Sequence, residues 1–232
     1  MIANMDDINV LAGRSLVYKV FQSLFGNPPS RQQLEVAAGE TVLDSVHLLS
    51  EGSIDDSLID RFVQEAEWSI SHMEETRRSY DRLFVGPGFL PAPPWESVYI
   101  CGERLLFQKS TLAIRKEYLD MGLLPTRYPH VADDHLALEL DYMAFLSDQA
   151  LASLESGNAH RVLYYMKASE RFLLKHLTQW FPVFLSKLEE WSDKGLYLSS
   201  AQLLDSLMRL DVVALRRLSE QIGAGLLDEK AQ

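Results

Sequence analysis

The residues best suited to chemistry lie near the middle of the chain, at Asp133-Asp134-His135 and at Glu139. His135 and Glu139 are four residues apart, so a helix would place them on one face, one turn from each other. Carboxylate and imidazole ligands at this spacing hold iron or zinc in helical bundles. One hypothesis is therefore a helical metal-binding enzyme that uses His135 and Glu139.

The wider patterns of such an enzyme are missing. A di-iron bundle needs Glu-x-x-His twice, and neither that string nor His-Glu-x-x-His occurs in the sequence. Cys101 is the single cysteine, so one chain can form neither a disulfide nor a multi-thiolate site, and we expect an inert packed thiol there. We therefore expect no metal site and no catalytic residue.

His176 and Trp180, one helical turn apart, form a second pair of residues that could take part in chemistry. We interpret them as a buried, hydrogen-bonded packing pair, with a secondary role in a binding site as the alternative.

Helical periodicity runs through the N-terminal part of the chain. A first helix is expected from Asp6 or Asp7 to the stop at Gly26-Asn27-Pro28-Pro29. Ser30 caps a second helix to about Leu49, and Asp55 or Asp56 opens a third.

The C-terminal part has the same character. Helices are expected from Glu96 to about Met121, after the breaks at Gly122, Pro125 and Pro129, and again after Gly157-Asn158. Pro182 should kink or restart the long helix there, and a last amphipathic segment runs from about Ser199 to Ile222. Since no segment shows sustained alternation, the expected fold class is all-α.

One boundary interrupts the helices. The run at 85–95, VGPGFLPAPPW, holds four prolines and two glycines, which no helix interior tolerates. We expect a single-domain helical bundle with N-terminal helices in 1–84, a proline-rich connector at 85–95 and C-terminal helices in 96–232.

Composition narrows the function classes. With 47% hydrophobic residues, the 232-residue chain should fold into one compact core. A net charge of −11 argues against nucleic-acid binding and permits a basic partner. No apolar run is long enough to span a bilayer, and the first residues lack an export pattern, so a cytoplasmic protein without stable membrane insertion is expected.

Three stretches of the chain resemble a known family. They are Tyr80-Asp81-Arg82-Leu83-Phe84-Val85-Gly86-Pro87 with Pro93-Pro94-Trp95-Glu96-Ser97-Val98-Tyr99, then Asp133 to Met143 (DDHLALELDYM), and Phe172 to Trp180 (FLLKHLTQW). They are similar, in the same order, to the YxxLFxGP and PPWESVY, DDHxxxELxFM, and F-x-x-x-H-x-x-x-W elements of the TorD/DmsD/NarJ chaperones. Tyr142 stands where Phe is commoner in that family.

The resemblance implies a function. Such a chaperone binds the twin-arginine signal peptide of a molybdopterin-dependent oxidoreductase subunit, assists its folding and cofactor insertion before export, and is not an enzyme. The implied partners are that leader and the apo catalytic subunit, and the chain would be a monomer or a domain-swapped homodimer. Family members are also linked to guanine nucleotide and to the molybdenum cofactor, but the sequence has no glycine-rich phosphate loop, so no resident cofactor is expected.

A receptor for such a leader needs carboxylates beside an apolar groove, because the leader offers two guanidinium groups and then an apolar segment. The predicted peptide-binding residues that meet this need are Tyr80, Leu83, Phe84, Pro94, Trp95, Glu96, Asp133, Asp134 and His135.

Each assignment has a structural alternative. Tyr80, Leu83 and Phe84 would instead belong to the core, and Trp95 and Glu96 would cap the helix that follows. One of Asp133 and Asp134 is expected to cap a helix while the other faces a guanidinium. A helical adaptor protein without a redox client would have the same length, composition, charge and helical character.

Overall fold

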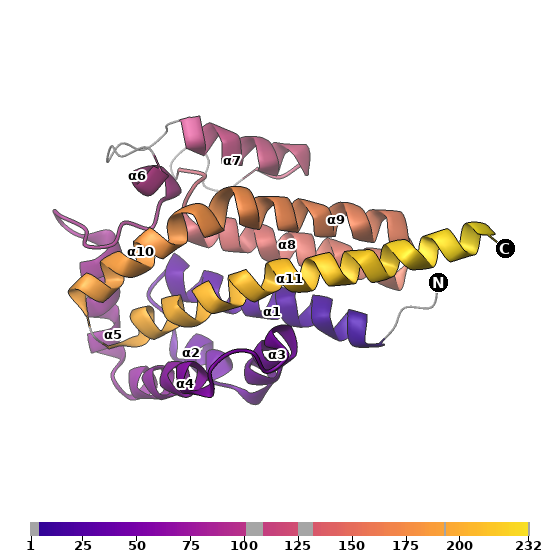
Figure 1. Cartoon of the computed structure of the whole chain (residues 1–232). Helices are drawn as coiled ribbons and strands as arrows, with labels where there is room; N and C mark the ends of the chain where they lie inside the picture. Colours follow the sequence, from indigo (N-terminus) through magenta and orange to yellow (C-terminus); the bar gives the residue numbers. More distant parts are fainter. Residues whose placement is uncertain (1–4, 101–108, 125–131, 193, 232) are drawn as a thin grey trace.

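The computed structural model describes residues 5–100, 109–124, 132–192 and 194–231. Within these ranges the chain is a bundle of helices without strands, and its one extended pairing is an isolated bridge between Trp95 and His135 (Figure 1). The predicted all-α fold is confirmed for the described residues. Across them, no helix combines the length and apolarity needed to cross a lipid bilayer.

The long helices α1 (Met5–Gly26) and α8 (Leu136–Glu155) form the centre of the bundle. Leu11, Phe21 and Leu24 of α1 are buried because the apolar stripe of that helix faces α8 and α3. Helix α1 begins at Met5, so Asp6 and Asp7 lie in its first turn and do not cap it as predicted. Their carboxylates still suit the positive end of the helix dipole.

The segment expected as one helix from Ser30 to Leu49 is two. Ser30 caps α2 (Arg31–Ala37) with a complete capping box, and α3 (Glu40–Ser50) begins after Gly39. A side chain at position 39 would lie 3.2 Å from the Val36 carbonyl oxygen, so glycine permits the tight turn between them. Asp55 caps α4 (Asp56–Ser71) as predicted, accepting a 2.9 Å hydrogen bond from the Ser57 amide.

Helix α5 (Met73–Tyr80) widens into a π-helical turn, η1 (Asp81–Val85), and the chain then runs without helix to Trp95. Gly86 turns it at a φ of 92°, a conformation that L side chains rarely adopt. Two helices follow, α6 (Glu96–Ile100) and α7 (Lys109–Asp120). The segment between these two helices, which was predicted to be helical and contains Cys101, lies outside the described residues. So does the predicted break at Pro125 and Pro129, after which a helix was expected to resume.

The predicted break at Gly157-Asn158 is confirmed, and Asn158 caps α9 (Ala159–Phe172). A helix restarts close to Pro182, as expected of a kink or restart there. A π-helical turn, η2 (Leu173–Leu177), comes first, and α10 (Thr178–Trp191) contains Pro182 in its interior. Side chains satisfy carbonyls in the widened turn, since Thr178 Oγ1 donates to the Leu173 oxygen at 2.9 Å.

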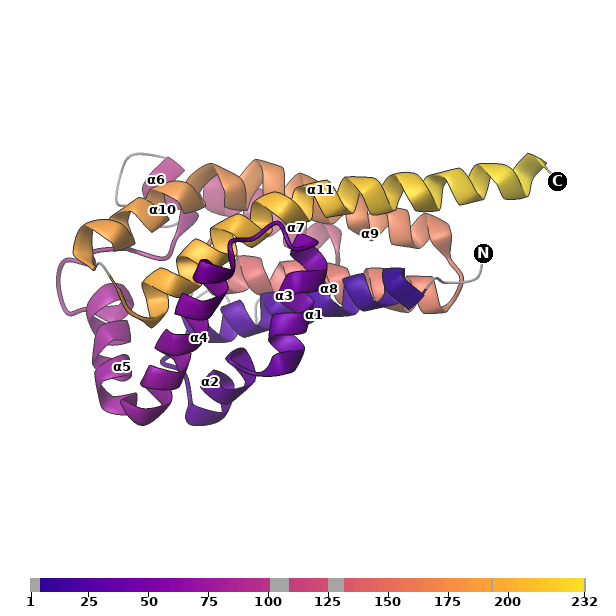
Figure 2. The same ribbon diagram turned by 60° about the horizontal axis from the view of Figure 1, so that its bottom comes forward.

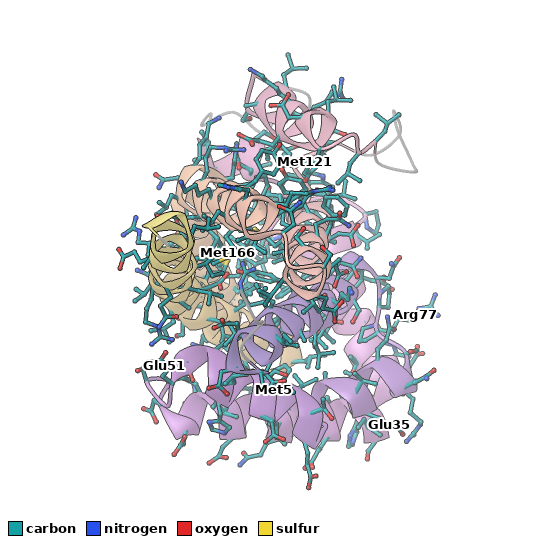
Figure 3. The ribbon with its side chains drawn as sticks, turned by 90° about the vertical axis from the view of Figure 1, so that its right-hand side faces the viewer. Met5, Glu35, Glu51, Arg77, Met121 and Met166 are labelled. Atoms are coloured by element: carbon teal, nitrogen blue, oxygen red, sulfur yellow. The ribbon has the colours of Figure 1, made fainter. Side chains whose placement is uncertain are left out.

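The last helix, α11 (Leu196–Ala231), runs along α9, α10 and α4, and it begins before the predicted Ser199 (Figure 2). Viewed from the right-hand side of Figure 1, Met166 of α9 lies between the helices, while Glu35 and Arg77 project from the margin (Figure 3). Because α1 packs against α8 and α11, helices from both sides of the connector share the core.

Candidate functional site

The end of the connector and the start of α8 pair side by side. The Leu136 amide donates to the Pro94 carbonyl at 2.9 Å, and the Glu96 amide donates to the Asp134 carbonyl at 3.0 Å. These two hydrogen bonds flank the β-bridge between Trp95 and His135. Two of the sequence motifs are therefore joined through their backbones.

Asp134 holds the first turn of α6. Its carboxylate accepts from the Ser97 amide at 2.8 Å and from the Thr111 hydroxyl at 3.1 Å, and the side chain is fully buried. A helix start leaves free amides, and this carboxylate satisfies one of them from a segment 37 residues away. Asp134 thus caps α6 and connects it to α7.

Asp133 is also buried and holds α7. Its carboxylate accepts from Arg115 Nε at 2.5 Å, and its carbonyl accepts from the Tyr118 hydroxyl at 3.1 Å. The prediction that one of these aspartates caps α8 is wrong. His135 caps it instead, because its Nδ1 accepts from the Ala137 amide at 3.1 Å.

His135 and Trp95 are only partly buried, whereas the residues directly beside them in the sequence, Pro94, Glu96, Asp134 and Leu136, are buried. The two rings meet edge to face at 5.2 Å. Burial lowers the pKa of His135 to about 4, against the opposite effect of the Asp134 charge, so the ring is neutral at neutral pH. A neutral Nδ1 can accept the capping hydrogen bond.

Buried carboxylates bind the two secondary residues. His176 Nδ1 lies 3.0 Å from Glu96 Oε2, and Trp180 Nε1 donates to Glu139 Oε2 at 3.2 Å. His176 and Trp180 are buried as predicted, but each pairs with a glutamate from another helix. Burial, and then the charge of Glu96, raise the pKa of Glu139 well above its usual value.

Tyr80, Leu83 and Phe84 lie in the aromatic core, each no more than 5% exposed, and Phe184 contacts both Phe84 and Trp180. The Tyr80 hydroxyl donates to the Phe25 carbonyl at 3.2 Å, and the Phe84 ring contacts Tyr197 at 5.2 Å. The structural alternative holds for these three in this conformation. The ring contact of Trp95 is with His135.

We call the group of buried polar residues around α6 the motif cluster; it comprises Glu96, Ser97, Thr111, Arg115, Asp133, Asp134, Glu139, His176 and Trp180. The sequence indicated five of its members as site residues and Glu139 only as a metal ligand. Ser97, Thr111 and Arg115 were missed, because nothing local shows which carboxylate they meet. Within the described ranges, no group of three or more His, Cys, Asp and Glu side chains is arranged to hold a metal ion.

Comparisons with known proteins agree on one family. Residues 55–186, which contain every motif above, match the family described as nitrate reductase delta subunit. The Tat proofreading chaperone DmsD of Salmonella typhi is 32% identical over 134 residues, 57% of this chain and 59% of that protein. The chaperone protein TorD of Vibrio parahaemolyticus is 29% identical over 203 residues, 85% of this chain and 92% of that protein.

The alignment with DmsD thus spans less than two thirds of that relative. A crystal structure described as a redox enzyme maturation protein, from Archaeoglobus fulgidus, covers 90% of this chain and 96% of its own with 18% identity and a TM-score of 0.48. The resemblance inferred from the central motifs is confirmed by the family match and by these two chaperones.

Proposed function

Because the chain belongs to the nitrate reductase delta subunit family, which includes the TorD and DmsD chaperones, we propose that it is a chaperone for the twin-arginine leader of a molybdopterin-dependent oxidoreductase. It would hold the apo catalytic subunit in the cytoplasm while the cofactor is inserted, and release it for export. Its matched relatives are chaperones and not catalysts.

The observation that carries this proposal is the match over residues 55–186, because it includes all three motifs. The structure gives those motifs a physical role. Buried hydrogen bonds from Asp134, just before α8, and from His176, in η2, hold α6 and the end of the connector in place. We infer that the motif cluster positions this corner, and that the partly exposed Trp95 and His135 are its residues available to a partner.

The metal-binding alternative has less support. Trp180 binds the Glu139 carboxylate, and the Ala137 amide occupies His135 Nδ1, so both groups already have partners within the chain. Nucleotide binding has little support as well, since Glu117 already pairs with Arg171 at 2.8 Å and Lys175 at 3.4 Å in the most basic hollow. We propose no resident cofactor.

The test is calorimetric titration of the purified protein with twin-arginine leader peptides of candidate oxidoreductases. Each peptide is compared with its Lys-Lys variant and with a scrambled peptide of equal composition. We expect saturable binding to one leader, weakened about tenfold or more by Lys-Lys, because lysine cannot make the planar two-point contact of arginine. Equal binding of native and scrambled peptides, or binding to none, would refute the proposal and favour an adaptor without a redox client.

A further inference from the structure

The exposed surface of α9 and η2 carries positive charge and no negative charge. The exposed residues of these two segments are His160, Arg161, Tyr164, Lys167, Arg171, Leu174 and Lys175. We call them together the α9 basic face. The whole chain has a net charge of −11, so a helix surface with four permanent cations and no carboxylate differs from the rest of the protein.

The acidic residue of α9, Glu170, does not neutralise this face. Its side chain is 25% exposed and accepts from Arg216 Nε of α11 at 2.5 Å. Arg161 donates to the neutral hydroxyl of Tyr165 at 3.0 Å. Lys167 has no hydrogen bond or ion pair within the described ranges. Two of the cations therefore have no carboxylate partner in the part of the chain that the structure describes.

Such a concentration of one sign is not needed to keep a protein in solution. A surface that serves solubility mixes both signs, as α4 does with exposed Asp60, Arg61 and Glu67. Lys167 and Arg171 are four residues apart on α9, a spacing at which like charges repel and slightly destabilise the helix. A negatively charged partner would turn this repulsion into attraction.

The α9 basic face continues into a hollow of about 520 Å³ that it shares with α7 (Figure 1). The hollow is lined by Lys116, Glu117, Asp120, Tyr164, Arg171 and Lys175. Buried Glu117 pairs with Arg171 at 2.8 Å and with Lys175 at 3.4 Å, yet these two side chains stay 50% and 56% exposed. Each keeps N–H groups for a second acceptor, so Glu117 holds both cations in place at the surface.

The chemistry of the face fits an acidic protein surface better than a phosphate-rich one. Glu117 and Asp120 would repel a phosphate group placed in the hollow. The net charge of −11 also opposes the approach of a nucleic acid or an anionic membrane. Beside the cations, Tyr164 is 52% exposed and Leu174 is 40% exposed, and tyrosine with arginine is enriched where proteins meet.

The face also borders the corner that a partner can reach at Trp95 and His135. Lys175 of the face precedes His176, and the His176 ring lies 3.0 Å from Glu96, the first residue of α6 and the neighbour of Trp95. A client subunit held by its leader at this corner would therefore have the rest of its chain within reach of α9.

We propose that the α9 basic face binds an acidic surface on the body of the client subunit, as a contact separate from that of the leader. This inference rests on the proposed chaperone function and adds a second region of the client to the complex. Because the two contacts belong to one client chain, each raises the effective concentration of the other, and the precursor binds more tightly than its leader alone.

The experiment titrates a client precursor, and separately its leader peptide, into the wild type and three variants. Lys167→Glu reverses one charge of the face, Lys167→Gln only removes it, and Arg77→Glu makes the same reversal on the exposed surface of α5 as a control. We expect Lys167→Glu to weaken precursor binding about fivefold, Lys167→Gln to weaken it about twofold, and Arg77→Glu to change nothing. The leader peptide should bind all four proteins equally. Added salt should weaken precursor binding more steeply for the wild type than for Lys167→Glu.

The outcomes separate the two proposals. If the precursor binds Lys167→Glu as tightly as the wild type, the α9 basic face is not a client contact and the chaperone function stands. Equal weakening of the precursor and the leader would also overturn the inference, because the face would then act through the leader or the fold. If the wild type binds neither, the chaperone function itself fails.

Vesicles that contain phosphatidylglycerol are the third titrant. Vesicle binding by the wild type that Lys167→Glu abolishes, with precursor binding unchanged, would assign the face to a lipid surface instead. All three variants should keep the far-UV circular dichroism of the wild type, since Lys167 and Arg77 are exposed.

Discussion

The buried ion pair of Arg14 and Asp211 provides a strong test of how the bundle is held together. Arg14 of α1 donates from Nε and from a terminal nitrogen to the two Asp211 oxygens, at 2.5 and 2.8 Å. Arg14 also donates to Ser147 of α8 at 3.2 Å, and the Tyr18 hydroxyl donates to Asp211 at 2.7 Å. The two charged side chains are 1% and 4% exposed, so water contributes little to either.

We expect Arg14→Met to cost about 3 to 5 kcal/mol of unfolding free energy, because it leaves the Asp211 charge buried with Tyr18 as its remaining donor. The double variant Arg14→Met with Asp211→Leu removes both charges and should recover most of that loss. For a chain of this size, the single change corresponds to a fall in melting temperature of roughly 6 to 20 °C.

Urea unfolding followed by circular dichroism measures these differences, and Arg209→Met is the matched control. Arg209 also makes two contacts with an aspartate, Asp205, but its side chain is 62% exposed. Its loss should cost less than about 1 kcal/mol. The reasoning fails if Arg14→Met is no worse than Arg209→Met, or if the double variant is as unstable as Arg14→Met.

Three further predictions concern the motifs. His176→Leu should destabilise the fold by about 2 kcal/mol, because it removes a hydrogen-bond partner from buried Glu96; an unchanged urea midpoint would contradict this. Because the pKa of His135 is about 4 in the folded chain and 6.5 ordinarily, the unfolded chain binds more protons between these values, and stability should fall as pH decreases from 6.5 to 4. An NMR titration of the His135 ring with a midpoint near 6.5 would exclude that linkage. Gly86→Ala should cost about 1 to 2 kcal/mol at its φ of 92°, whereas helical Gly223→Ala, with open space around it, should stabilise by about 0.5 to 1 kcal/mol, both measured by thermal unfolding.

Local signals predicted helix ends well where a single capping residue determines the backbone conformation. Asp55 caps the helix expected of it, and Asn158 caps the helix expected after the break at Gly157-Asn158, because a short polar side chain reaches an amide two or three residues away. The prediction failed at Gly39, since a glycine within a helical pattern can be tolerated or can end the helix. Near Pro182 the helix restarts at Thr178 after a widened turn, and the proline lies within α10.

In the motif cluster, too, some features follow from the sequence and others only from the packed structure. The family resemblance placed Glu96, Asp134 and His176 in matched motifs, but no local pattern shows that Asp134 caps α6 or that Glu96 meets His176. All three side chains are buried and hydrogen bond within the chain. Whether a leader contacts the remaining predicted residues stays a prediction.

By itself, the sequence determined the helical class, several helix ends and the family resemblance, because periodicity, caps and prolines act over a few neighbouring residues. Tertiary structure alone decided which faces meet. Arg14 and Asp211 are 197 residues apart, and no local pattern distinguishes a buried arginine from an exposed one until α1, α8 and α11 are packed. Pairing of buried charges depends on the positions of whole helices, and those positions follow from the sum of many apolar contacts across the core.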